Sequence, residues 1–242
     1  MSDTKLYSFD PAHPITVSLS YTINETPHTL THELRRATLA ELLERDAQSV
    51  TELEEIAPGE DVFHTEAVAA NARLWDRVAK RVQGYKVGTA TKDQWIEVTP
   101  ELAAKIPSAH KHAAITGLYA ANCTVEMDAD EGFSLDGDTY RIKQTIGASD
   151  APEFVILHTL KQPTESERRE YDASAGKASQ VMGSRKRKLR FRTNLKADVA
   201  LYDKLFVSVT GCEPATVDAI DPILKRQAVQ SLLAALNASL SD

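Results

Sequence analysis

The chain repeats itself, and this internal repeat constrains its fold more than any other feature of the sequence. Residues 32–47 align with residues 158–173 at seven identical positions, whereas roughly one identity is expected by chance over such a window. Residues 70–78 align in the same way with residues 197–205. His158 follows His32 by 126 residues, and Tyr202 follows Trp75 by 127. This near-constant separation predicts a tandem duplication of one supersecondary unit.

A strand element precedes the repeated block in each half. Apolar residues at alternate positions from Ile15 to Ile23 predict a strand with one buried face. In the second half, Asp136-Gly137 predicts a tight turn between Phe133-containing and Tyr140-containing strands. Residues 154–157 predict a further strand that leads into the repeat. Each half therefore starts with a β element.

Three helices are predicted after each β element. Thr38 and Thr164 each stand three residues before a glutamate, which is the capping-box pattern of a helix start. The second helix would carry Trp75 or Tyr202 in equivalent core positions, and would end at Gly84 or Gly211. A weaker third block aligns Pro107 with Pro222, 115 residues later, near the first turn of a third helix.

These elements predict an α+β fold made of two tandem copies of a module, each with a short β-hairpin or sheet followed by about three helices. The first module covers residues 1–130. The second, homologous module covers residues 131–242 and contains a basic insertion loop at 177–194. The boundary is placed in the acidic stretch at residues 126–132, which lacks apolar periodicity.

Composition narrows the functional classes. The 28 basic and 35 acidic residues give a formal charge of -7, which disfavours general attraction to nucleic acid or anionic lipid. Cys123 and Cys212 are far apart and have no metal-ligand spacing, so we expect neither a disulfide framework nor a zinc site. The first residues lack the pattern of a secretion signal, and no stretch has the roughly 18 apolar residues of a membrane span. We therefore expect a cytoplasmic protein.

No catalytic motif is evident. His110 and His112 point to different faces of a helix, which suits neither a zinc pair nor a catalytic base with its orienting group. His32 and His158 match across the repeat, and we expect them to have structural roles at a strand-to-helix junction. The carboxylates of the first helix are explained by capping and by the helix dipole. We expect no enzyme activity, no metal and no cofactor.

A basic run in the second half is the candidate partner-binding site. It consists of Arg185, Lys186, Arg187, Lys188, Arg190, Phe191 and Arg192. Such a run can neutralise phosphates, and its aromatic residue can stack on a base. It can equally form a solvated loop that contacts an acidic protein surface. We favour protein contact, because the repeat places the run between the first two helices, where loops that contact partners are expected.

The combined pattern resembles the tail assembly chaperones of tailed bacteriophages. The shared features are the β element, a basic strand end (Leu34-Arg35-Arg36 and Leu160-Lys161-Gln162), a Thr-capped acidic helix and an Asp-Pro-led final helix. The duplication departs from the single small domain of that family. The resemblance implies a non-enzymatic protein of the host cytoplasm that binds other phage structural proteins, namely tail tube and tape measure subunits, during morphogenesis.

Two other functions stay open. The chain could be a structural virion protein of the neck, tail or baseplate, in contact with neighbouring subunits or copies of itself. It could also be a nucleic-acid-binding adaptor that uses residues 185–192. A virion protein is expected in purified particles, an assembly chaperone is not, and an adaptor is expected to bind nucleic acid in a salt-sensitive way.

Overall fold

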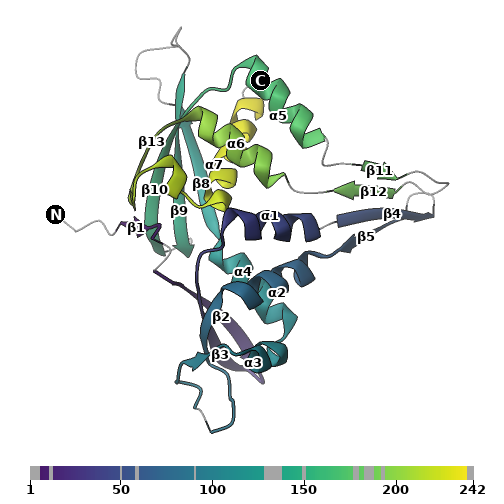
Figure 1. Cartoon of the computed structure of the whole chain (residues 1–242), viewed down its shortest axis with the longest axis vertical. Coiled ribbons are helices and arrows are strands. Elements are labelled where there is room, and N and C mark those ends of the chain that lie inside the picture. Colours follow the sequence, from purple (N-terminus) through teal and green to yellow (C-terminus); the bar gives the residue numbers. More distant parts are fainter. Residues whose placement is uncertain are drawn as a thin grey trace. The chain divides into compact units, whose positions relative to one another are not determined.

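The protein has an α+β fold with several antiparallel sheets and seven helices among the described residues (Figure 1). The computed structural model describes residues 6–10, 13–49, 51–57, 60–89, 91–127, 138–148, 151–176, 180–182, 188–191 and 194–238. The chain forms two compact units. The amino-terminal unit comprises residues 11–119 and 179–193, and the carboxy-terminal unit comprises residues 1–10, 120–178 and 194–242. These units do not coincide with residues 1–130 and 131–242, because both are built from discontinuous segments.

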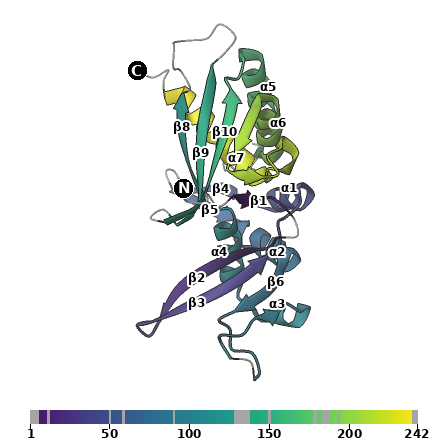
Figure 2. The ribbon, with the colours of Figure 1, turned by 90° about the vertical axis from the view of Figure 1, so that its left-hand side faces the viewer.

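A four-stranded antiparallel sheet organises the amino-terminal unit, in the order β2-β3-β6-β7. Its strands are β2 (Ile15–Ile23), β3 (Thr26–Leu34), β6 (Ala79–Gln83) and β7 (Ile96–Glu97). Asn24 and Glu25 connect β2 to β3 with positive φ angles, as a two-residue hairpin requires. Figure 2 shows this long β2–β3 hairpin. The predicted alternation in β2 is confirmed, since Val17 is buried between two exposed residues.

Four described helices belong to the same unit as this sheet. They are α1 (Leu39–Gln48), α2 (Ala67–Val78), α3 (Pro100–Lys105) and α4 (Ser108–Leu118). The predicted capping box is confirmed at α1, where Thr38 accepts a hydrogen bond from Glu41 N and the Glu41 carboxylate accepts one from Thr38 N. Helix α4 packs on β2, and α2 packs on both α1 and α4. The resulting core includes the fully buried Leu34 and Trp75.

The sheet of the carboxy-terminal unit has the order β13-β10-β9-β8. Its strands are β8 (Ala121–Met127), β9 (Thr139–Ala148), β10 (Ala151–Lys161) and β13 (Phe206–Thr210). The predicted turn at Asp136-Gly137 lies outside the described residues, and β8 and β9 on either side of it are antiparallel neighbours. A further short pair joins β1 (Tyr7–Ser8) in parallel to β14 (Cys212–Glu213).

Three helices lie on one side of this second sheet, as Figures 1 and 2 both show. They are α5 (Glu165–Gly176), α6 (Leu195–Leu205) and α7 (Pro222–Ala238), with a short 3-10 helix, η1 (Val217–Ala219), before α7. The Thr164 capping box is confirmed by its reciprocal bonds with Glu167. Helix α5 is largely exposed, as its polar sequence predicts, whereas α6 and α7 supply core residues such as Tyr202 and Leu232.

A third antiparallel sheet combines two hairpins in the order β11-β12-β4-β5. The first hairpin, β4 (Thr51–Ala57) and β5 (Glu60–Thr65), lies between α1 and α2. The second, β11 (Gln180–Met182) and β12 (Lys188–Phe191), lies between α5 and α6. The region 177–194 is therefore not an insertion peculiar to the second half, because the first half has a hairpin at the same place.

The sequence interpretation of the second helices was wrong at their carboxyl ends. Helices α2 and α6 stop at Val78 and Leu205, and the strands β6 and β13 follow at once. Gly84 and Gly211 come directly after these strands, with φ angles of +93° and +83°. A β-carbon at either glycine would collide with a backbone carbonyl of the neighbouring strand, so the backbone approach requires glycine. The positive φ at these two glycines was predicted. It belongs, however, to a close approach between strands and not to the end of a helix.

Candidate functional site

His32 stands at the centre of a buried polar chain in the amino-terminal unit. Its Nδ1 accepts a hydrogen bond from Trp75 Nε1 at 3.1 Å, so Nε2 carries the proton of the neutral ring. That Nε2 lies 3.2 Å from the Tyr85 hydroxyl, which in turn lies 3.1 Å from His110 Nδ1. Burial, with a smaller contribution from His110, lowers the pKa of His32 to about 4. Burial also raises the pKa of Tyr85 well above its usual value. These hydrogen-bonded side chains form a neutral structural network.

His158 forms the corresponding network in the carboxy-terminal unit. The Tyr202 hydroxyl lies 2.7 Å from His158 Nδ1, and Gln144 Oε1 lies 2.9 Å from His158 Nε2. Because the amide oxygen can only accept, the proton again resides on Nε2. Burial lowers the pKa of His158 to about 4. Both histidines are completely buried, which fits the structural role that the sequence predicts for them.

A buried lysine packs over the aromatic residue of each network. Lys111 Nζ bonds Asp76 at 2.5 Å and lies 5.1 Å from the centre of the Trp75 ring. Lys225 Nζ bonds Asp203 at 2.6 Å and lies 5.6 Å from the Tyr202 ring. These matching lysines are 114 residues apart, one residue fewer than the sequence alignment of the third helices predicts. Their ammonium groups neutralise a neighbouring carboxylate and contact an aromatic face.

A second polar cluster joins three helices in each unit. Asn71 on α2 accepts from Arg45 Nε at 2.7 Å and donates to His112 Nδ1 at 3.0 Å. At the matching place on α6, Asp198 accepts from the Tyr171 hydroxyl at 2.8 Å and from Arg226 Nε at 3.0 Å. Burial and the Asp198 carboxylate raise the pKa of Tyr171. Each cluster satisfies its members within the unit, so none presents a free acid or base.

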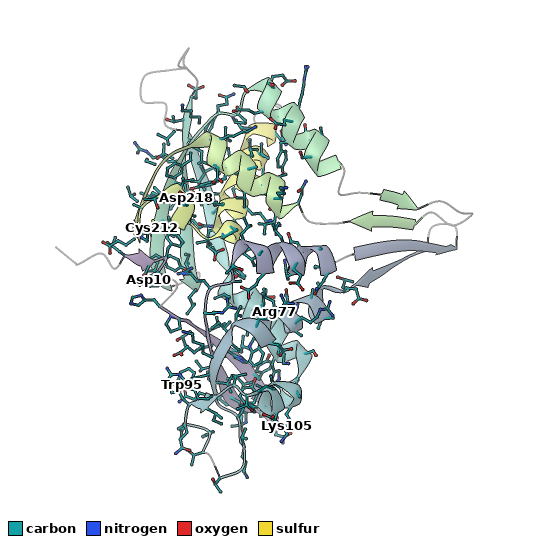
Figure 3. The ribbon with its side chains drawn as sticks, viewed as in Figure 1. Asp10, Arg77, Trp95, Lys105, Cys212 and Asp218 are labelled. Carbon is teal, nitrogen blue, oxygen red and sulfur yellow. The ribbon has the colours of Figure 1, made fainter. Side chains whose placement is uncertain are left out.

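Two small grooves are lined by positions that correspond in the same order along the sequence. The α1–α2 groove is lined by Glu41, Glu44, Arg45, Gln48, Ala70, Arg73, Leu74 and Arg77, and the α5–α6 groove by Glu167, Glu170, Tyr171, Ser174, Ala197, Ala200, Leu201 and Lys204. Arg77, labelled in Figure 3, pairs with Glu44 across the first groove, and Lys204 pairs with Glu170 across the second. Their volumes of about 10 and 50 Å³ are too small for an organic ligand.

A larger hollow of about 400 Å³ lies beside α3 in the amino-terminal unit. Its lining is mainly small and apolar, including Ala79, Val98 and Ala103, and its charged members are Asp76 and Lys111. Since these two residues already form an ion pair, the hollow lacks the convergent polar groups that orient a small-molecule substrate.

The predicted basic site is described only in part. Arg185, Lys186, Arg187 and Arg192 lie outside the described residues, and Lys188, Arg190 and Phe191 belong to β12. The register sets Lys188 opposite Glu54 and Arg190 opposite Glu52 on β4. This part of the basic run is therefore built into a sheet beside acidic positions.

The other predicted site residues fall in separate places. His110 and His112 reach different partners, Tyr85 and Asn71 respectively, so they do not act as a pair. Both cysteines are free, and burial raises the pKa of Cys123 and takes that of Cys212 to about 11, which keeps both thiols protonated. Within the described ranges, no cluster of three or more His, Cys, Asp or Glu side chains is suited to hold a metal ion.

The outer edge of β2 is the feature that sequence reasoning missed. Among the strands that the structure describes, β2 pairs only with β3, although it is nine residues long. It contains no charged residue, no proline and no glycine. Natural proteins usually guard such an edge with charges, proline or a covering segment, because it can pair with another chain. The sequence feature that could have indicated this edge is the alternation of apolar and uncharged polar residues from Ile15 to Ile23.

The described helices include none that is both long enough and apolar enough to cross a membrane. Compared with protein-family models, curated proteins and solved structures, the chain matches none.

Proposed function

We propose that this chain is a non-enzymatic assembly protein that binds a segment of another protein. The observation that carries the proposal is the long, uncharged edge strand β2, which pairs on one side only among the described strands. Exposed backbone N–H and C=O groups along an edge are a ready site for strand addition. The buried polar side chains support the proposal, because the histidines bond aromatic and amide groups while the lysines and Arg226 bond carboxylates. Among the described residues these bonds leave no convergent catalytic group.

We further propose that the two halves descend from one duplicated module. Support comes from the two grooves, whose eight lining residues correspond one to one at separations of 126 or 127 residues. The sheets add a detail that the sequence could not give. The register between β3 and β6 shifts after Glu33, and that between β10 and β13 shifts after Thr159, again 126 residues later.

The resemblance to phage tail assembly chaperones suggests the partners. On this proposal the protein acts in the cytoplasm of a bacterial host and holds tail tube or tape measure subunits ready for assembly. A structural virion protein is the second candidate. The same edge strand could bind a neighbouring subunit permanently in the particle, where a chaperone would bind its client only transiently. A nucleic-acid adaptor is disfavoured by the position of Lys188 and Arg190 opposite acidic residues.

The test is mass spectrometry of the tagged protein with its co-purified partners, together with mass spectrometry of purified phage particles from the same source. An assembly chaperone captures tail proteins and is missing from the particles. Stoichiometric presence in particles would establish the virion protein instead. Absence of any tail component from both samples, with salt-sensitive retention of nucleic acid, would overturn the proposal in favour of the adaptor.

A further inference from the structure

Strand β2 and strand β9 hold corresponding places in their sheets, but among the described strands only β9 has a neighbour on both sides. Val17 lies opposite His32 in one sheet, and Ile142 lies opposite His158 in the other. On the far side of β9, the strand β8 adds seven antiparallel pairs, from Ala121 with Ile146 to Met127 with Tyr140. No described strand occupies that place beside β2. The carboxy-terminal unit thus shows what a covered edge of this sheet looks like.

Burial differs between the two strands as the missing neighbour predicts. The inward positions of β9 are Tyr140, Ile142, Gln144 and Ile146, and the first three are buried. The matching positions of β2 are Ile15, Val17, Leu19 and Tyr21, of which only Val17 is buried and the others are half-buried. Ile15 and Leu19 therefore keep surface in water that their counterparts Tyr140 and Gln144 lose, and covering this apolar surface would be favourable.

Strand β8 also shows which chemistry suits this place. Its core-facing residues are Ala121, Cys123 and Val125, all small or medium in size and placed at alternate positions. Helix α7 packs on β8, and it is 17 residues long, whereas α4 has 11. In the part of the amino-terminal unit that the structure describes, there is neither a covering strand nor this extra length of helix.

We propose that the outer edge of β2 binds an extended segment of a partner protein as an added antiparallel strand, with small or medium apolar residues at alternate positions. The inference rests on the proposed function, since it names the binding mode of the assembly protein. A partner segment fits better than a second β2, because a second β2 would bring Leu19 and Tyr21 where β8 brings small side chains. Backbone hydrogen bonds supply the affinity, and the alternate side chains supply the selectivity.

The first experiment uses the intact chain and a synthetic peptide with the sequence of residues 121–127, in which C123S prevents disulfide formation. Hydrogen exchange is measured with and without the peptide at millimolar concentration. We expect the amides of Ile15–Ile23 to exchange at least ~5-fold more slowly with the peptide, because new hydrogen bonds protect an edge. No change in β2, or protection confined to β9 through replacement of β8, would overturn the proposal.

The second experiment compares two variants one residue apart. L19K places an ammonium group on the inward face, where an added strand would bury it, so the peptide should bind at least ~10-fold more weakly. S20K adds the same charge on the exposed face and should change the affinity by less than about 2-fold. Thermal melts establish that both variants are folded. If L19K fails to fold, Y21K provides the same test nearer the hairpin turn. Equal binding by a folded inward variant and S20K would contradict the proposed mode.

The outcomes separate this inference from the proposed function. Tail proteins that co-purify equally well with wild type and L19K would refute the edge while leaving the assembly role intact. Peptide binding at β2 without any captured tail protein would support the edge and refute that role. Concentration-dependent dimers in which β2 is protected without peptide would identify a second copy as the occupant and overturn the inference.

Discussion

The two units use the same positions for buried polar groups and fill them with different chemistry. In the amino-terminal unit, the neutral Asn71 takes its cation from α1, through Arg45. In the carboxy-terminal unit, the charged Asp198 takes its cation from α7, through Arg226, and α5 supplies a tyrosine instead. The helices have exchanged roles while the cluster has kept its place. The comparison teaches that the buried polar side chains at such a site must all be hydrogen-bonded to one another, and that it matters less which helix supplies each partner.

This difference predicts unequal losses when the two central residues are removed, and it is the largest effect we expect. Asp198→Ala should destabilise the protein by about 3–5 kcal/mol, because Arg226 stays buried without that carboxylate. Asn71→Ala should cost only about 1–3 kcal/mol. Asn71 is neutral, so its removal takes a hydrogen bond from Arg45 but no negative charge from a buried cation. The free energy of unfolding from urea titration measures both.

A double variant provides the control for this prediction. Asp198→Asn combined with Arg226→His places the asparagine and histidine of the amino-terminal cluster at the corresponding positions of the carboxy-terminal one. The double variant should be more stable than the sum of the two single losses implies, because each single change leaves one mismatched partner. A loss for Asp198→Ala no greater than that for Asn71→Ala would break the comparison.

The matching histidines predict a shared dependence of stability on pH. Burial lowers the pKa of His32 and of His158 from 6.5 to about 4 in the folded chain. The unfolded chain therefore binds more protons between these values, so stability is fully present above pH 6.5 and falls as the pH is lowered toward 4. Well inside this window, each histidine contributes a slope of about 1.4 kcal/mol per pH unit.

Urea titrations between pH 6.5 and 5.5 test this slope above the range in which Glu41 begins to matter, because the Arg35 contact and the cap lower its pKa from 4.5 to about 2. His158→Gln should remove about half of the histidine slope, because His32 still titrates. A flat profile for the wild type across the window would contradict the assigned neutral networks.

The smallest expected effects concern the two helix starts. Thr38→Ala and Thr164→Ala should each cost about 1 kcal/mol, since each threonine accepts the same capping bond at 3.3 Å. The glutamates should differ, because Glu41 also binds Arg35 through both of its oxygens. Thermal melts should therefore show a larger decrease in Tm for Glu41→Ala than for Glu167→Ala. Unaltered melts for both threonine variants would refute the assigned caps.

Sequence reasoning found the elements that local chemistry defines. The capping boxes at Thr38 and Thr164 were predicted because their hydrogen bonds lie within one helical turn, and Trp75 and Tyr202 were predicted as core because helical spacing buries them. The strands β6 and β13 were missed, because they are five residues long and are stabilised by pairing with distant strands.

The polar networks could be anticipated only in outline. The match of His32 with His158 pointed to a structural role, but their partners come from other elements that only the fold brings together. Lys111 and Lys225 gave no usable signal, since lysine is usually exposed and its burial here depends on Asp76 and Asp203. The third-block alignment came within one residue of pairing them.

The path of the chain through its sheets determines when each unit is completed during synthesis. Tyr7 pairs with Cys212, so strand β1 gains its neighbour only after most of the chain has been synthesised. Strand β4 likewise waits for β12. A polypeptide cut between the halves would lack strands that the other half supplies. Each unit therefore needs segments from both halves of the sequence, so we expect neither half to be stable when expressed alone.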